Sequence, residues 1–228
     1  MRRVTGVLWH PRATMAEVVR HPAFITTWVV VLLAVLVCGG LLLSTPVGRQ
    51  ALVDERVRVT EALGNRVDDA EYARLQAQPP LLTYWTSGGR LLVTPELTLL
   101  IALGLMLLAR LDGVQMTYVT ALAIAVHATV VLALQQMLAT PVHYLYESLT
   151  SPFNVASILR VFDEGTWASR LFGTIDVFGI WWMWLMAVGL ATASRRSTGR
   201  YFWRLLAVYV GVAALVAGVF AVLGQGSI

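Results

Sequence analysis

Three ionisable side chains stand inside or beside long apolar stretches of the sequence, and they are the first candidates for chemistry. His127 lies near the middle of one stretch, whereas Glu96 and Asp176 lie near the starts of two others. Such groups are costly inside a membrane, so each is a candidate functional group. His127 could carry a proton, and Glu96 and Asp176 could line a polar vestibule with Gln135 and Gln136. The structural alternative is a neutral hydrogen-bonded histidine and two carboxylates that cap helix N-termini.

The sequence holds none of the usual catalytic patterns. It has no His-Glu-x-x-His, no Gly-x-Ser-x-Gly and no phosphate-binding loop. Its one cysteine, Cys38, excludes an internal disulfide and a multi-cysteine metal site, and no base lies near it in its own stretch. We therefore expect no catalytic residue, no cofactor, no metal and no enzyme activity. The weakest alternative is an enzyme acting on lipid near Glu96 and Asp176.

These candidates must be positioned by membrane-spanning helices. Of the 228 residues, 57% are hydrophobic and 13% are charged, whereas soluble domains carry about 25% charged residues. A helix needs about 20 apolar residues to cross a bilayer, and five stretches approach or exceed that length: 23–45, 91–109, 117–139, 173–194 and 201–224. The sequence predicts an all-α membrane bundle of five transmembrane helices, forming a single domain over 1–228. The first stretch is too long for a signal-peptide core, so we expect it to be retained.

The arginines predict the orientation of the bundle, because short loops rich in basic residues stay on the cytoplasmic side. All 17 basic residues are arginines; segment 1–22 holds four against one acid, and 195–204 holds four against none. Segment 46–90 has six arginines and six acids, and 140–172 has two arginines and three acids. With five spans, the N-terminus is predicted inside and the C-terminus outside. The net charge of +4 then reflects orientation, and we expect no nucleic-acid partner.

The inner segment 1–22 is predicted to form a short amphipathic helix. Thr14 and Glu17 have the spacing of a capping box, and the helix should end at His21, before Pro22. It would lie on the inner leaflet or form a docking surface for a protein partner. The candidate docking residues are Trp9, Pro11, Arg12 and Glu17, with Arg195 and Arg196 from the other inner segment.

The outer segments are predicted to be structured as well. In 46–90 we expect a helical hairpin, with one helix over 50–63 and a second, capped by Asp68 and Glu71, running to about residue 78. The hairpin would be a solvated cap or a partner-binding arm. Pro95 is placed to begin the second span. In 140–172, a helix over 153–162 is expected to lie in the outer interface.

Two stretches resemble the Yip family, membrane proteins named for interacting with Ypt/Rab GTPases, in its prokaryotic branch. One is Trp9-His10-Pro11-Arg12-Ala13-Thr14-Met15 leading to His21-Pro22; the other is Asp176-Val177-Phe178-Gly179-Ile180-Trp181, continued by Leu185, Gly189 and Leu190 and followed by Arg195-Arg196. The resemblance implies five spans and a membrane scaffold or adaptor, linked in eukaryotes to vesicle traffic. The long N-terminal region of the eukaryotic pattern is not present in this sequence, so a GTPase partner is not expected.

The leading hypothesis is therefore a non-enzymatic scaffold or adaptor in the inner (cytoplasmic) membrane of a prokaryote. It would bind the lipid bilayer and either a membrane-protein partner or further copies of itself as a homo-oligomer. The alternative is a transporter or channel-like component that uses His127 and the region of Glu96 and Asp176.

Overall fold

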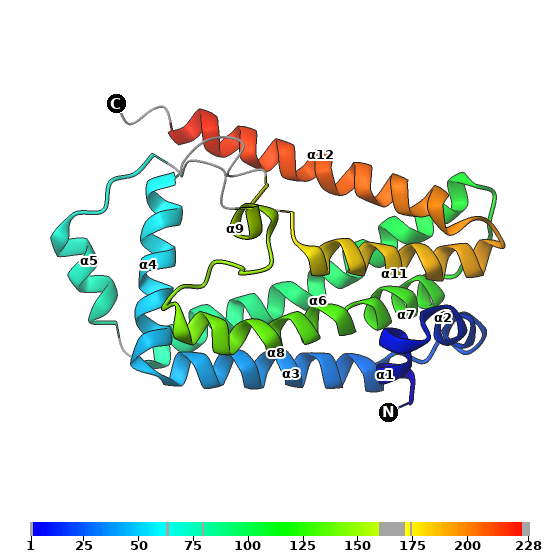
Figure 1. Ribbon diagram of the computed structural model, residues 1–228, viewed down its shortest axis with the longest axis horizontal. Coiled ribbons are helices and arrows are strands. Elements are labelled where there is room, and N and C mark those ends of the chain that lie inside the picture. Colours follow the sequence, from blue (N-terminus) through cyan, green and yellow to red (C-terminus); the bar gives the residue numbers. More distant parts are fainter. Residues whose placement is uncertain (1, 63, 79, 160–171, 174, 225–228) are drawn as a thin grey trace. The chain divides into compact units, whose positions relative to one another are not determined.

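The structure, a computed structural model, describes residues 2–62, 64–78, 80–159, 172–173 and 175–224 (Figure 1). Its helices are α1 (Arg2–Trp9), α2 (Pro11–Arg20), α3 (Ile25–Ser44), α4 (Pro46–Ala62), α5 (Asp69–Gln76), α6 (Pro80–Leu111), α7 (Tyr118–Ala128), α8 (Val130–Leu145), α9 (Val155–Leu159), α11 (Val177–Ser194) and α12 (Thr198–Gly224). Within the described residues, β-pairing is limited to one isolated bridge, between Asn154 and Asp176. The predicted all-α class is confirmed.

Four stretches of helix have the length and composition to cross a membrane. They are Ile25–Ser44, Tyr118–Tyr146, Val177–Ser194 and Thr198–Val216, and they correspond to four of the five predicted spans. The remaining predicted span, 91–109, falls within α6, where the side chains of 80–94 lie outside the described part. The spans expose large apolar side chains, such as Leu33 at 52% and Leu215 at 69%. Such surfaces suit contact with lipid tails rather than water.

The chain divides into two compact units, which are described separately. Unit 1 comprises Met1–Leu36, Gly89–Gln136 and Phe178–Val208, and unit 2 comprises Val37–Gly88, Met137–Val177 and Tyr209–Ile228.

The core of unit 1 is built around α7. Every residue from Ala121 to Ala128 is buried, so this helix is covered on all sides. Both α1 and α2 pack against it. On α11, Gly189 is buried, and a Cβ there would collide with the side chain of Ile124. The glycine therefore allows α7 and α11 to approach closely, as small residues do in membrane bundles.

Two predicted helix starts are wrong. Thr14 does not begin the inner helix, because α2 already starts at Pro11 and is preceded by α1. The hydroxyl of Thr14 is instead used in packing, where a Cβ on Gly6 would lie 2.6 Å from it. Pro95 does not begin a helix either, because it stands inside α6. Proline is tolerated inside membrane helices, where neighbouring groups satisfy the freed carbonyl. A proline pattern alone therefore cannot distinguish a proline that begins a helix from one that stands inside it.

In unit 2, α4 packs against α5, and these two helices fall within the segment 46–90. Asp68 caps α5 as predicted, accepting a 2.7 Å hydrogen bond from the Glu71 amide. Across the pair, the Tyr72 hydroxyl donates to Asp54 at 2.8 Å, and Gln50 donates to the same oxygen at 2.9 Å. The hydrogen bond to Asp54, and then partial desolvation, raise the pKa of Tyr72 above its ordinary value.

The predicted helix over 153–162 begins later than expected. The helix α9 starts at Val155, because the side chain of Asn154 accepts a 2.6 Å hydrogen bond from the Ser157 amide and caps the helix at that point. The end of the predicted helix, from residue 160 onward, lies outside the described residues.

Candidate functional site

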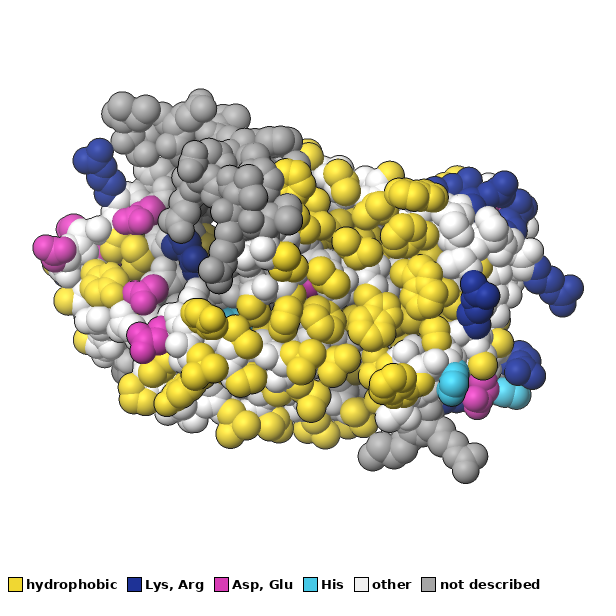
Figure 2. Space-filling view, in the orientation of Figure 1, with side chains coloured by type: hydrophobic (Ala, Val, Ile, Leu, Met, Phe, Trp, Pro, Cys, Tyr) yellow, Lys and Arg dark blue, Asp and Glu magenta, His cyan; other side chains and the backbone are white. Residues whose placement is uncertain are grey.

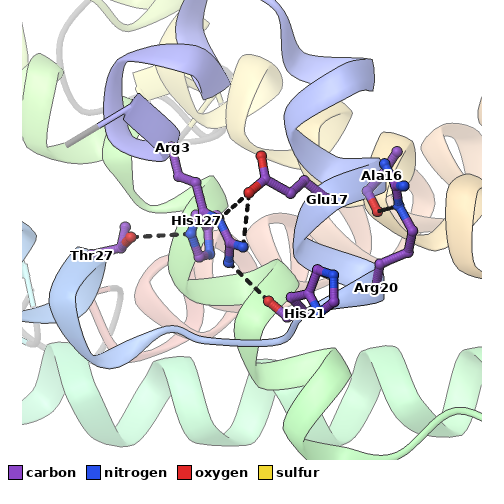
Figure 3. Close-up of polar contacts among 7 residues, drawn as sticks. All are labelled: Arg3, Ala16, Glu17, Arg20, His21, Thr27 and His127. Atoms are coloured by element: carbon purple, nitrogen blue, oxygen red, sulfur yellow. Dashed lines mark hydrogen bonds and ion pairs between the residues drawn. The ribbon is translucent and has the colours of Figure 1, made fainter.

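His127 is completely buried in α7, and both of its ring nitrogens are in hydrogen bonds. Figure 3 shows the one to Thr27. Nδ1 lies 2.8 Å from the carbonyl oxygen of Ala123, and Nε2 lies 3.0 Å from the hydroxyl of Thr27 at the start of α3. A carbonyl can only accept, so Nδ1 carries a proton, and in the neutral ring Nε2 then accepts from the Thr27 hydroxyl. This is the arrangement of a neutral histidine that ties α3 to α7.

The helices α1 and α2 form a compact element, which we call the N-terminal cap (residues 2–20). Its apolar face is fully buried through Val7, Met15 and Val18. Arg3 binds one carboxylate oxygen of Glu17 through Nε at 3.1 Å and Nη2 at 2.9 Å, and its Nη1 donates to the carbonyl of His21 at 2.8 Å (Figure 3). Glu17 is half exposed, so the ion pair adds at most about 1 kcal/mol. Burial of the apolar side chains supplies most of the attachment.

The predicted docking residues of segment 1–22 lie on or beside this cap. Trp9 is 78% exposed at the end of α1, Arg12 is exposed on the first turn of α2, and Pro11 is half-buried. Glu17 is engaged with Arg3. The cap thus presents an aromatic and a basic side chain from a firmly packed base. Sequence reasoning missed the role of Arg3, because a pair separated by 14 positions across two helices has no local signature.

A second polar cluster of unit 1 gathers around Asp112, which follows α6. Arg204 Nη1 lies 2.8 Å from one carboxylate oxygen, Arg200 Nη1 lies 3.9 Å from the other, and Arg196 donates to the Asp112 carbonyl at 2.9 Å. Sequence reasoning missed this cluster. A signal existed, because Asp112 is an isolated acid among arginine-rich inner segments.

The arginines determine the charge state of Asp112. Desolvation raises its pKa, but the hydrogen bond from Arg204, the nearby buried Tyr201 hydroxyl, and the charges of Arg204 and Arg196 outweigh this and hold the pKa below its ordinary value of 3.8. The Tyr201 hydroxyl has no partner in full hydrogen-bonding geometry among the described residues, so Arg204 contributes the stronger contact. Asp112 is therefore a carboxylate at neutral pH.

This lowered pKa predicts a specific acid sensitivity. A group whose pKa is lower in the folded state stabilises the fold above its unfolded pKa, near 3.8, and loses that contribution as pH falls toward its folded pKa. Asp112→Asn should remove the part of the acid destabilisation that comes from this residue. Thermal unfolding in neutral detergent between about pH 7 and pH 3 measures it. Parallel pH profiles for the two proteins would show that Asp112 is not linked to folding.

Asp176 and Glu96 lie in different units. Asp176 immediately precedes α11, so this helix begins later than the predicted start of the span at residue 173. Strand-like hydrogen bonds to the 153–155 segment delay the helix start, with the Val155 amide donating to the Ile175 carbonyl at 2.9 Å and the Val177 amide to the Phe153 carbonyl at 3.2 Å.

The carboxylate of Asp176 accepts a 2.6 Å hydrogen bond from the hydroxyl of Ser151, and Glu96 is exposed on α6. The vestibule that would join the two carboxylates, with Gln135 and Gln136, stays a prediction.

The metal-binding potential of the described residues is low. Among them, no group of three or more His, Cys, Asp or Glu side chains is placed to hold a metal ion.

The helices and their exposed apolar surfaces define the class of the molecule as a multi-pass, all-helical membrane protein. Residues 5–222 match the family model described as the Yip1 domain. The match covers nearly the whole chain, and the protein belongs to the Yip1 domain family. Comparison with curated proteins and with solved structures gives no match.

Proposed function

We propose that the protein is a non-enzymatic membrane scaffold or adaptor that acts by binding a protein partner or further copies of itself. The observation that carries the proposal is the N-terminal cap. It is packed on α7 through buried Val7, Met15 and Val18 while leaving Trp9 78% exposed. A rigid base with an exposed aromatic side chain is typical of protein-binding surfaces.

The proposal includes a location and an orientation. The arginine-rich ends of unit 1 would face the cytoplasm of a prokaryotic cell, with the C-terminus outside, because basic loops are retained on that side. Figure 2 supports this placement, since basic side chains gather at the end of unit 1 where the cap and the α11–α12 connection lie. The cap would then meet partners at the inner surface of the membrane.

Site-specific photocrosslinking in native membranes tests the proposal. A photoreactive residue replaces Trp9 in the full chain, and the matched control carries it at Arg74, which is exposed on α5. We expect a protein adduct of defined mass from position 9 and a much weaker one from position 74. A mass twice that of the chain would identify self-assembly.

Two results together would overturn the proposal: position 9 gives only lipid adducts, and the protein purified in mild detergent is strictly monomeric. Transport through His127 receives less support, because both ring nitrogens are engaged by Thr27 and Ala123.

A further inference from the structure

One end of unit 1 carries a cluster of five arginines. They are Arg110, Arg195, Arg196, Arg200 and Arg204, and all are exposed. Asp112 is the one carboxylate that the structure brings into contact with the cluster among the described residues. One negative charge cannot neutralise five positive ones, so the cluster retains a local charge of about +4. We call it the arginine cluster.

The arginine cluster is held at the edge of the membrane. Arg195 and Arg196 lie in the short connection between two candidate spans, Val177–Ser194 and Thr198–Val216, so they cannot lie far from the bilayer surface. Trp203 is 67% exposed on the first turns of α12. Exposed tryptophan at this depth is typical of the lipid headgroup region. The guanidinium groups are therefore placed at the level of lipid phosphates.

Asp112 orders the cluster instead of merely neutralising it. It contacts three arginines, with Arg204 at 2.8 Å, Arg200 at 3.9 Å and Arg196 through its backbone carbonyl at 2.9 Å. Each guanidinium has five N–H donors, and the hydrogen bonds to Asp112 use one donor from Arg204, one from Arg196 and none from Arg200, which lies 3.9 Å away. The remaining donors suit bidentate binding of a phosphate group.

The backbone at Arg195 provides a second, independent observation. Arg195 has φ of 54°, and the Arg196 amide donates to the Ala191 carbonyl at 3.1 Å. This is a Schellman-type helix end, and its left-handed position is usually glycine because a side chain there is strained. An arginine at a position where glycine would be more stable suggests a function for its charge.

From the charge, the position and the strained arginine we propose that the arginine cluster binds the phosphate headgroups of anionic phospholipids in the adjoining leaflet. The inference does not depend on the proposed scaffold function. Phosphatidylglycerol is the probe, and phosphatidylcholine of equal chain length is the neutral comparison. Basic residues near an anionic membrane surface each contribute about fivefold in affinity.

The test uses the full chain purified in neutral detergent and titrated with each lipid, with lipid retention measured by native mass spectrometry. The double variant R195Q/R200Q is expected to lose about 30-fold in phosphatidylglycerol affinity and to change little toward phosphatidylcholine. The control R66Q/R74Q makes the same change in net charge in unit 2, at two exposed arginines in and just before α5, and we expect it to retain the lipid.

Arg195→Gly separates binding from folding. It relieves the strained backbone, so the melting temperature should rise by about 2–4 °C, while phosphatidylglycerol affinity should fall about fivefold. Equal retention of the two lipids by the native chain, or unchanged retention by R195Q/R200Q, would overturn the proposal. Full competition by soluble glycerophosphate would overturn it as well, because the site would then recognise a free anion.

Discussion

Replacing Gly189 by alanine is expected to destabilise the protein by about 1–3 kcal/mol, the usual cost of overpacking a filled core. The added methyl group would collide with Ile124, whose Cγ1 would lie 3.0 Å and whose Cβ would lie 3.3 Å from it. Ile124 cannot easily move aside, because every residue from Ala121 to Ala128 is buried. The two helices would have to separate, and α7 is the helix on which the N-terminal cap rests.

The matched control is the same substitution at Gly104, where a Cβ meets no atom within 4 Å. Alanine is favoured over glycine inside a helix by about 0.5–1 kcal/mol, so G104A should be neutral or stabilising. Thermal unfolding in detergent measures both, and a change of 1 kcal/mol corresponds to about 2–4 °C for a chain of this size. The double variant I124A/G189A should cost less than the sum of the two single variants, since alanine at position 124 lacks the two Cγ atoms of Ile124 that the added methyl group would meet.

The outcome that would contradict this account is a G189A variant as stable as G104A. α7 and α11 would then have room for a methyl group at position 189. If G189A costs as much in the I124A background as in the native chain, the methyl group clashes elsewhere.

The membrane helices could be predicted from the sequence because their signal is an average over about 20 residues. The stretch 23–45 became Ile25–Ser44, and 201–224 lies within α12. The predictions of the exact helix starts were wrong where they depended on the type of a single residue. A proline can either begin a helix or stand inside one, and the residues before it determine which occurs. Here the residues before Pro95 form the first half of α6, so Pro95 stands inside the helix.

The polar contacts of the candidate site were less predictable, because they join residues far apart in the chain. His127 was identified as a buried group, but its partner Thr27 lies 100 positions away. Asp112 and Arg204 are separated by 92 positions. Composition indicates that such charges need partners, whereas helix packing selects the partners. Local pairs were predicted better, as with Asp68 and the Glu71 amide.

Removing His127 should have a large effect on stability. His127→Ala leaves the buried Thr27 hydroxyl without its acceptor and creates a cavity in the most buried part of α7. Cavity formation and loss of a buried hydrogen bond together should cost about 3 kcal/mol. Thr27→Val, which keeps the shape of the side chain, should cost less, about 1 kcal/mol, because hydrogen bonds in membrane interiors are individually modest.

A double-mutant cycle distinguishes a structural histidine from a functional one. Replacing both partners, in H127L/T27V, should cost less than the sum of the single variants H127L and T27V, because the pair is removed together and neither partner is left facing the other unpaired. The same variants, reconstituted into vesicles, should retain the photocrosslink at position 9 once they are folded. If H127L is as stable as the native chain but abolishes a solute or proton flux in vesicles, the hydrogen bond to Thr27 is incidental. A role in transport would then explain His127 better than a structural role does.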